Sequence, residues 1–382
     1  MSATVEELTR NAVDVLPHGA LEEKLKLGRP LRVKFGIDVT APDVHIGNAI
    51  PLQRMRAFQD AGHLGVLIIG DYTTRIGDPS GRSAERPLLS PEEIDRNAHT
   101  YLTQAGKVID LDRTEVRFNG EWLAKLDFAE VLRITRTLTV AQLLERDDFA
   151  KRFAAREPIS VSELLYPLMQ GYDSVAVNAD VELGGTDQLY NLLAGRALQE
   201  AYGQEPQIVL TTPLLLGFDG EKMSASRNNY VGLAEPPEEQ FGKVMRISDE
   251  LLPDYYRLVA QLELPAGEPM QAKLALARWT VARSHGENAG REAEAHFTRV
   301  VREGQAPEEV PDAPLPDGDP VHLPAALAAA FGLSTSEARR LISQGGVRVN
   351  GDVVRELDVA RGTLLDATVQ AGKRRFARFA GA

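Results

Sequence analysis

The feature that most constrains the fold is an apolar strand that runs directly into a polar turn and then a helix. Residues 31–37 are mostly apolar and include β-branched side chains, as in a buried strand, and a helix is expected to start near Gly47. The turn at residues 38–48 lies between them. Backbone N–H groups at a helix start and the helix dipole both favour anions, so this turn predicts a phosphate site.

Strand-like and helix-like segments alternate through the first part of the chain. Strands are expected at residues 31–37, 65–70, 180–183 and 207–210, and helices at 49–61, 90–109, 161–177 and 194–202. The helix at 90–109 opens with Ser90, Pro91 and two acids, which is an N-cap signature. This alternation predicts an α/β fold, a Rossmann-like parallel sheet with ligands at the carboxyl ends of its strands.

The pattern changes along the chain and indicates several domains. We expect a catalytic domain over residues 1–234, with an insertion of short amphipathic helices at about 116–160. A helical domain is expected at 235–302, followed by an extended linker at 303–320 that is rich in proline and lacks lysine and arginine. A small α+β domain is expected at 321–382.

Charge and composition narrow the functional classes. The chain carries a net charge of −12, yet residues 334–382 hold nine basic and five acidic side chains, a local charge of +4. A basic module on an acidic body indicates localised polyanion binding. The absence of cysteine excludes disulfides and thiol nucleophiles, and the seven histidines lack ligand spacing, so no protein-made metal site is expected. Without a membrane span or a signal segment, a cytoplasmic location is expected.

A polar helix face and two loops complete the candidate site. Tyr166, Gln170 and Asp173 are spaced i, i+4 and i+7, so they share one face of an otherwise apolar helix, where a ligand hydroxyl or ammonium would partner a buried Asp173. Asp187, after paired glycines, suits a helix cap by default or a ribose contact. The loop at residues 222–226, Lys-Met-Ser-Ala-Ser, is weak evidence by itself and gains weight from the phosphate turn.

These segments together resemble the bacterial tyrosyl-tRNA synthetases, a family of class I aminoacyl-tRNA synthetases, over residues 31–379. The most specific segments are residues 76–83, 166–173 and 181–188. The family's HIGH motif stands here as His-Ile-Gly-Asn at 45–48, and its KMSKS motif as residues 222–226. Residues 336–342 and 345–351 resemble the small RNA-binding domain named after a ribosomal small-subunit protein.

The resemblance implies an enzyme that activates tyrosine with ATP, accompanied by substrate-bound Mg²⁺, and then charges tRNA(Tyr). It implies a homodimer formed through the insertion. The implied transition-state residues are Thr40, His45 and Lys222. The implied tyrosine-binding residues are Asp78, Tyr166, Gln170, Asp173 and Gln188. The implied ATP-binding residues are Asp38, Gly47, Asn48, Arg82, Arg86, Gly185, Asp187, Met223 and Ser224. The implied tRNA-binding residues are Arg339, Arg340, Arg348, Lys373, Arg374 and Arg375.

The chain departs from the family pattern at three positions. Asn48 replaces the second histidine of the first motif, a mild change because its amide still donates a hydrogen bond. Ala225 replaces the second lysine of the mobile loop, which removes a cation and predicts slower activation. Lys34 stands where one branch of the family has a tyrosine near the substrate hydroxyl, which indicates a rearranged pocket.

Two alternatives compete with this interpretation. A non-enzymatic paralogue would retain RNA binding through the tail and would have lost activation with the second lysine. A class I synthetase for tryptophan is disfavoured by Asp173, because an indole N–H would be poorly placed to donate to its carboxylate. The basic tail also disfavours it.

Overall fold

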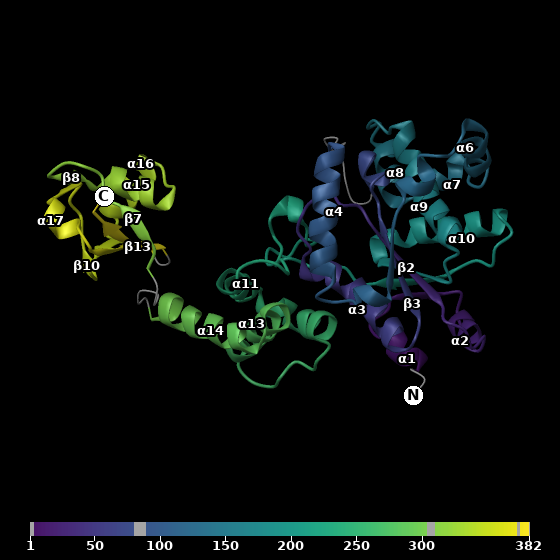
Figure 1. Ribbon diagram of the computed structural model, residues 1–382, viewed down its shortest axis with the longest axis horizontal. Coiled ribbons are helices and arrows are strands. Elements are labelled where there is room, and N and C mark those ends of the chain that lie inside the picture. The colour runs from purple at the N-terminus through teal and green to yellow at the C-terminus, as the bar shows by residue number, and fades with distance from the viewer. Residues whose placement is uncertain (1–3, 80–88, 304–309, 373–374, 382) are drawn as a thin grey trace. The chain divides into compact units, whose positions relative to one another are not determined.

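The computed structural model describes residues 4–79, 89–303, 310–372 and 375–381 (Figure 1). Its contacts divide the chain into two compact units. The first consists of Met1–Pro236 and Lys243–Leu276, and the second of Pro237–Gly242 and Ala277–Ala382. Each unit contains its own sheet structure.

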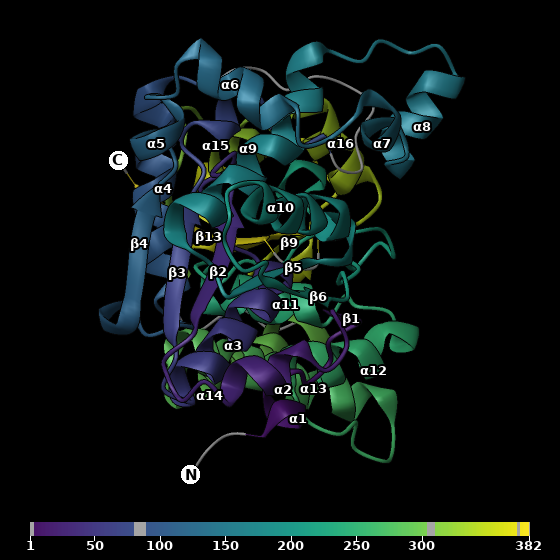
Figure 2. The ribbon, with the colours of Figure 1, turned by 90° about the vertical axis from the view of Figure 1, so that its right-hand side faces the viewer.

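The first unit is built on a six-stranded sheet in the order β1-β6-β5-β2-β3-β4 (Figure 2). Its strands are β1 (Asp14–Leu16), β2 (Arg32–Ile37), β3 (Leu64–Ile69), β4 (Thr114–Phe118), β5 (Val181–Gly185) and β6 (Ile208–Thr212). All neighbours pair in parallel except β1, which joins β6 antiparallel. The near-continuous burial of β3 and β6 is typical of parallel strands covered on both faces. The predicted α/β class is confirmed.

Helices cover both faces of this sheet (Figures 1 and 2). α3 (Ile46–Asp60) and α4 (Pro91–Ala105) connect β2 to β3 and β3 to β4, and right-handed crossovers put both helices on one face. α9 (Val161–Val177) and α10 (Leu189–Ala201) pack together on the other face. The Ser90 side chain caps α4, as its sequence predicts, and Ser160 caps α9. The short helices α1 (Val5–Leu8) and α2 (Ala20–Leu25) precede β2.

The insertion begins later than expected. Its helices are α5 (Gly120–Leu123), α6 (Phe128–Thr135), α7 (Val140–Leu144) and α8 (Asp147–Ala154). Residues 114–118, partly assigned to the insertion from the sequence, instead form the edge strand β4. An edge strand tolerates the alternating charges of this segment, which hid it from a search for apolar runs. Ile134 on α6 packs with Leu168 and Leu198, so the insertion is anchored on α9 and α10.

The predicted separate helical domain at 235–302 does not match the division of contacts. Helix α11 (Pro237–Val244) and helix α13 (Pro269–His285) are each shared between the two units, and α12 (Leu252–Asp254) belongs to the first. The mismatch arises because the residues after α12 pack against the sheet-containing first unit. The Tyr255 hydroxyl donates to the Leu216 carbonyl at 2.6 Å, and Gln53 Nε2 on α3 donates to the Val259 carbonyl at 2.9 Å.

The second unit contains α14 (Glu287–Phe297) and a small α+β fold. A five-stranded sheet has the order β10-β9-β12-β13-β7, and β11 pairs with β8. The strands are β7 (Asp312–Pro314), β8 (Val321–His322), β9 (Val347–Val349), β10 (Asp352–Val353), β11 (Asp358–Val359), β12 (Thr368–Ala371) and β13 (Arg375–Ala380). Helices α15 (Leu323–Phe331), α16 (Thr335–Ser343) and α17 (Arg361–Leu364) complete it.

Part of the expected linker belongs to this small fold. β7 pairs in parallel with β13, and Leu315 is buried with Leu327, Ile342 and Phe379 in one core. Pro314 in β7 is compatible with an edge strand, which has one pairing side. The extended, solvated linker predicted at 303–320 is therefore wrong for residues 312–315.

Candidate active site

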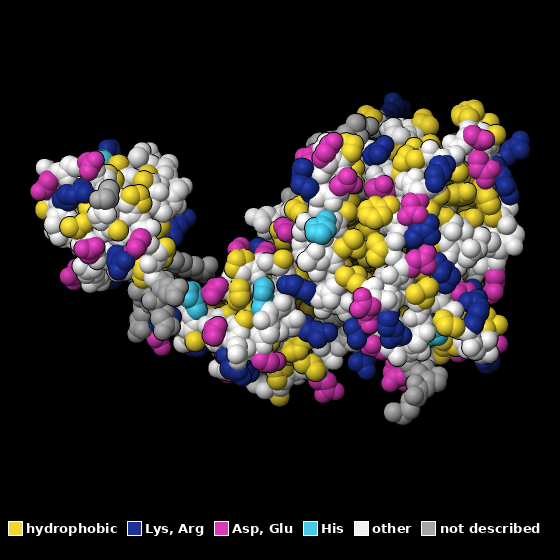
Figure 3. Space-filling view, viewed as in Figure 1, with side chains coloured by type: hydrophobic (Ala, Val, Ile, Leu, Met, Phe, Trp, Pro, Cys, Tyr) yellow, Lys and Arg dark blue, Asp and Glu magenta, His cyan; other side chains and the backbone are white. Residues whose placement is uncertain are grey.

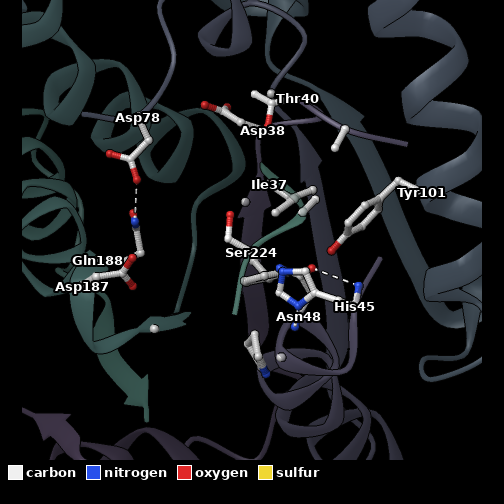
Figure 4. A pocket seen from close by; sticks show the side chains of 18 of the residues that line it. Ile37, Asp38, Thr40, His45, Asn48, Asp78, Tyr101, Asp187, Gln188 and Ser224 are labelled. Atoms are coloured by element: carbon white, nitrogen blue, oxygen red, sulfur yellow. Dashed lines mark hydrogen bonds between the residues drawn. The ribbon is translucent and has the colours of Figure 1, made fainter. Parts of the chain in front are cut away.

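A cavity of about 730 Å³ opens at the carboxyl ends of the parallel strands of the first unit (Figure 4). Residues expected from the sequence converge on it from distant segments. They are Asp38, Thr40, His45, Gly47, Asn48, Asp78, Tyr166, Gln170, Asp173, Gly185, Asp187, Gln188, Lys222, Met223 and Ser224. Figure 4 shows Asp187 and Gln188 across the cavity from His45 and Asn48. The expected Arg82 and Arg86 lie outside the described residues.

The N-terminus of α3 forms one wall. His45 is its N-cap residue, and His45 Nδ1 accepts a hydrogen bond from the Asn48 backbone N–H at 3.3 Å. Asn48 Oδ1 in turn accepts from the His45 backbone N–H at 3.2 Å, which closes a capping box. Gly47 leaves room for this cap, because a Cβ there would lie only 3.0 Å from His45 Nδ1. The helix dipole makes this wall favourable for an anion.

Burial determines the charge of His45, and its hydrogen bonds determine its tautomer. Burial, and to a smaller extent the charge of Lys222, lowers the pKa of His45 to about 4. The ring is therefore neutral near pH 7. Because Nδ1 accepts the Asn48 amide, the hydrogen-bond network assigns the ring proton to Nε2. His45 thus offers a neutral N–H donor.

Backbone pairing brings the Lys222 loop to the same wall. The Ile46 N–H donates to the Val231 carbonyl at 2.9 Å, and the Leu233 N–H donates to the Val44 carbonyl at 2.8 Å. The buried Asn229 orders the loop internally, since its Oδ1 accepts from the Ser224 N–H at 2.8 Å. Lys222 Nζ lies 2.6 Å from Asp187 Oδ2. The loop lysine therefore forms an ion pair with a residue of the opposite wall.

Asp38 is fixed by two hydroxyl donors. Thr73 Oγ1 donates to Asp38 Oδ1 at 2.7 Å, and the Tyr166 hydroxyl donates to Oδ2 at 3.0 Å. Gly70 leaves the space for this contact, because a Cβ there would collide with both Asp38 and Thr73. Burial and the Asp38 charge raise the pKa of Tyr166, so its hydroxyl stays protonated and donating.

Asp78 is tied to the insertion. Gln188 Nε2 donates to Asp78 Oδ2 at 2.6 Å, and the Arg146 guanidinium lies 3.2 Å from Asp78 Oδ1. Arg146 also donates to Asn191 Oδ1 at 3.0 Å, and Asn191 donates back to Gln188 at 2.9 Å. Through Arg146, the insertion helps to hold a wall of the cavity.

Asp173 is the most deeply buried carboxylate of the cavity, with 3% of its surface exposed. Trp122 Nε1 donates to its Oδ1 at 2.8 Å, and Asn119 Nδ2 approaches its Oδ2 at 3.3 Å. Burial raises the pKa of Asp173 to about 7, against the opposing effects of Lys34 and of these two donors. A ligand hydroxyl would supply a further donor to this carboxylate.

Lys34 lies behind the cavity wall, close enough for its charge to act on Asp173. It is fully buried beside Glu182, with Nζ 2.8 Å from Glu182 Oε1, and its neighbours Phe35 and Gly36 line the cavity. Because side chains alternate along β2, Lys34 points toward α9. Lys34 therefore packs behind the cavity wall and does not line the cavity.

Several residues of the site were missed from the sequence. Asn119 and Trp122 follow β4, and recognising that strand would have placed Asn119 at the carboxyl edge of the sheet. Thr73 and Arg146 gave no local signal, because a hydroxyl in a turn and an arginine in a helical insertion are ordinary surface residues.

The expected RNA-binding arginines are exposed in the small fold. Arg339 and Arg340 lie on α16, Arg348 on β9 and Arg375 on β13. The alternation of β9 buries Val347 and Val349 and turns Arg348 outward. Lys373 and Arg374 lie outside the described residues.

Among residues 4–79, 89–303, 310–372 and 375–381, no group of three histidine, aspartate or glutamate side chains is arranged to hold a metal ion. Within the same ranges, no helix combines the length and the apolar character that a membrane crossing requires.

The raised pKa of Asp173 makes stability depend on pH. Between pH 3.8 and about 7 the folded chain retains a proton that the unfolded chain loses, so this group lowers the free energy of unfolding as pH rises. Asp173→Asn lacks this titration. Relative to the unmodified protein, the variant should gain roughly 3 kcal/mol of unfolding free energy between pH 5 and pH 8. Urea unfolding at both pH values measures it; a pH-independent difference would contradict the assignment.

Two family models match the chain. The model described as tRNA synthetases class I (W and Y) matches residues 26–301, and the S4 domain model matches residues 323–358. The first therefore covers the cavity and every strand of its sheet except β1, and the second lies within the small fold of the second unit.

Curated relatives match almost the whole chain. The tyrosine–tRNA ligase of Geobacter sulfurreducens is 49% identical, with 97% of each chain covered, and that of Thermotoga maritima is 46% identical, with 99% of this chain and 97% of the other covered. A tyrosyl-tRNA synthetase from Archaeoglobus fulgidus, solved with L-tyrosine, shares the fold at a TM-score of 0.61 and 21% identity, over 76% of this chain and 98% of the other. The chain belongs to the class I tRNA synthetases, in the tyrosine–tRNA ligase family.

Proposed function

We propose that this protein activates L-tyrosine with ATP and transfers the tyrosyl group to the 3′ end of tRNA(Tyr). The observation that carries the proposal is one cavity with two chemically different ends. A helix N-terminus and Lys222 face each other across one part of it, and the buried Asp173 carboxylate lines another. Polyphosphate suits the first environment, and a phenol hydroxyl suits the second.

The tyrosine end is rich in acceptors. Asp173 would accept the phenol hydrogen, while Trp122 and Asn119 hold the carboxylate in place. Asp78, Tyr166 and Gln170 would surround the α-ammonium group, which carries the charge that a carboxylate-lined pocket favours. Gln188, fixed on Asp78, would lie near the reacting carboxylate.

The nucleotide end is built for charge that develops on phosphate. The neutral His45 Nε2–H and the Thr40 hydroxyl would donate to phosphate oxygens without disturbing the charge of bound ATP. Lys222 would leave Asp187 for the pyrophosphate side, and Asp187 would then accept from the ribose. Asp38, Gly185, Gly47 and the loop residues after Lys222 would frame the nucleoside. Mg²⁺ would enter with ATP as part of the substrate.

The first step is an in-line displacement. The tyrosine carboxylate oxygen attacks the α-phosphorus of ATP, an O–P bond forms, and the bond to the β-phosphate oxygen breaks as pyrophosphate leaves with the electron pair. The attacking carboxylate is already ionised, so the step needs positioning and charge stabilisation rather than a strong base. In the second step the terminal ribose hydroxyl of tRNA attacks the adenylate carbonyl, and AMP leaves.

The exposed arginines of the small fold, which lie on α16, β9 and β13, would hold the tRNA backbone. We also propose a homodimer through the insertion. Phe128 and Phe153 are 76% and 64% exposed, with Val140 and Val161 exposed nearby in sequence. Hydrophobic side chains gather on this part of the surface (Figure 3), and burial in a partner would remove them from water. ATP and tRNA as substrates suggest a cytoplasmic location.

The central test is tyrosine-dependent exchange of pyrophosphate into ATP. Asp173→Asn cannot accept the phenol hydrogen as a carboxylate does, so kcat/KM for tyrosine should fall at least about tenfold, while KM for ATP stays within about twofold. Equal losses for both substrates would contradict the pocket assignment. No exchange by the unmodified protein would favour the non-enzymatic alternative.

Ala225 lines the cavity where the family has a second loop lysine. Ala225→Lys restores a cation on the pyrophosphate side and should raise the exchange rate about tenfold, which corresponds to ~1.4 kcal/mol of transition-state stabilisation. Ala225→Met, similar in length but uncharged, is the matched control. An equal gain in both variants, or none in the lysine variant, would show that charge at this position does not limit activation.

The small fold should be needed for tRNA charging and not for adenylate formation. Because β7 belongs to its sheet, the deletion should begin directly after Arg302 rather than beyond Pro320. The truncated protein should keep pyrophosphate exchange within about twofold and lose tRNA charging at about 0.15 M salt, where long-range attraction is screened. If tRNA charging survived the deletion, the proposed RNA-binding role of the small fold would be wrong.

A further inference from the structure

Behind the tyrosine end of the cavity lies a buried ion pair that no proposed step uses. Lys34 on β2 and Glu182 on β5 are directly paired positions of two parallel strands, and their side chains are 0% and 1% exposed. Lys34 Nζ lies 2.8 Å from Glu182 Oε1. Replacing a buried ion pair with apolar residues is often neutral for stability, so stability alone gives little reason for this one.

The pair is connected to the helix that carries the tyrosine-binding residues. Lys34 Nζ donates to the Gln170 backbone carbonyl at 2.9 Å and to Ser174 Oγ at 2.7 Å. With Glu182 as its third partner, the ammonium group uses all three of its donors. Lys34 therefore holds one turn of α9 against the sheet, between Gln170 and Ser174.

Glu182 fixes the side-chain amide of Gln170. Gln170 Nε2 approaches Glu182 Oε1 at 3.3 Å, and Ser174 Oγ donates to Oε2 at 3.1 Å. The buried Gln207 Nε2 also donates to Oε2. An ionised carboxylate accepts hydrogen bonds and donates none, so it binds the NH₂ group of Gln170 and leaves the amide oxygen for the cavity. Gln170 is a cavity-lining residue.

We propose that the Lys34–Glu182 pair is a positioning device that holds the Gln170 amide with its oxygen toward the substrate, and so selects an amino acid by its α-ammonium group. This inference rests on the proposed function, because it needs Gln170 at the ammonium end of bound tyrosine. If the Gln170 amide were free to flip, it would present its NH₂ group instead of its oxygen to the ammonium group about half of the time. Two hydrogen-bond donors repel each other, so this orientation would weaken binding.

The test compares L-tyrosine with 3-(4-hydroxyphenyl)propionate, which is tyrosine without its ammonium group. The inhibition constant of the analogue in pyrophosphate exchange, divided by KM for tyrosine, measures selection for ammonium. In Lys34→Met/Glu182→Leu both charges are replaced by apolar groups and the amide loses its anchor. The ratio should fall about tenfold, with KM for ATP within about twofold and the folded state retained in urea unfolding.

Lys24→Met is the matched control. Lys24 is also buried and lies 3.5 Å from Asp180, just before the start of the same strand β5 and away from its carboxyl end. This variant should lose stability and keep the ratio. Ser174→Ala keeps both charges and removes the hydroxyl that bridges them, so its ratio should fall about threefold. If the double variant does not fold, this single variant tests the positioning role.

The outcomes separate the two proposals. A folded double variant with an unchanged ratio, or an unchanged Ser174→Ala if the double variant is unfolded, would overturn the positioning role. Loss of the ratio in Lys24→Met as well would make the effect one of general stability and would also overturn it. If the unmodified protein itself binds the analogue as well as tyrosine, the ammonium site of the proposed function fails instead.

Discussion

The structure of the active site depends on the pairing of two backbone segments that are far apart in the sequence. Residues 44–46 lead into α3, and residues 231–233 follow the Lys222 loop; hydrogen bonds from Ile46 to Val231 and from Leu233 to Val44 join them. Without this pairing the loop lysine would have no fixed relation to the helix N-terminus. The sheet supplies the rest, because its five parallel strands, β2 to β6, all deliver their carboxyl ends to one edge.

The cavity combines groups whose protonation its environment determines. His45 is kept neutral by burial at a helix start, which leaves it a donor to phosphate without a permanent charge. Asp173 is held by two N–H donors, yet burial still raises its pKa. The carboxylate is thus costly to ionise in the empty site, and a phenol hydroxyl would relieve that cost by donating to it.

The sequence was informative where the signal was local. The apolar run of β3 marked a buried parallel strand, and helical periodicity placed Tyr166, Gln170 and Asp173 on one face of α9, where all three line the cavity. Non-local features were missed. The charged edge strand β4 depends on pairing with β3, and β7 depends on pairing with β13. The position of Lys34 required knowing that β2 and β5 are neighbours, which no local pattern reveals.

The central claim is that one cavity receives tyrosine and ATP end to end. A crystal structure with a non-hydrolysable analogue of tyrosyl-adenylate tests it most directly. The account predicts the phenol oxygen within hydrogen-bonding distance of Asp173, the ammonium group beside the Gln170 oxygen, and the phosphate at the N-terminus of α3. An analogue bound elsewhere, or bound in this cavity with its adenosine against Asp173, would contradict the account.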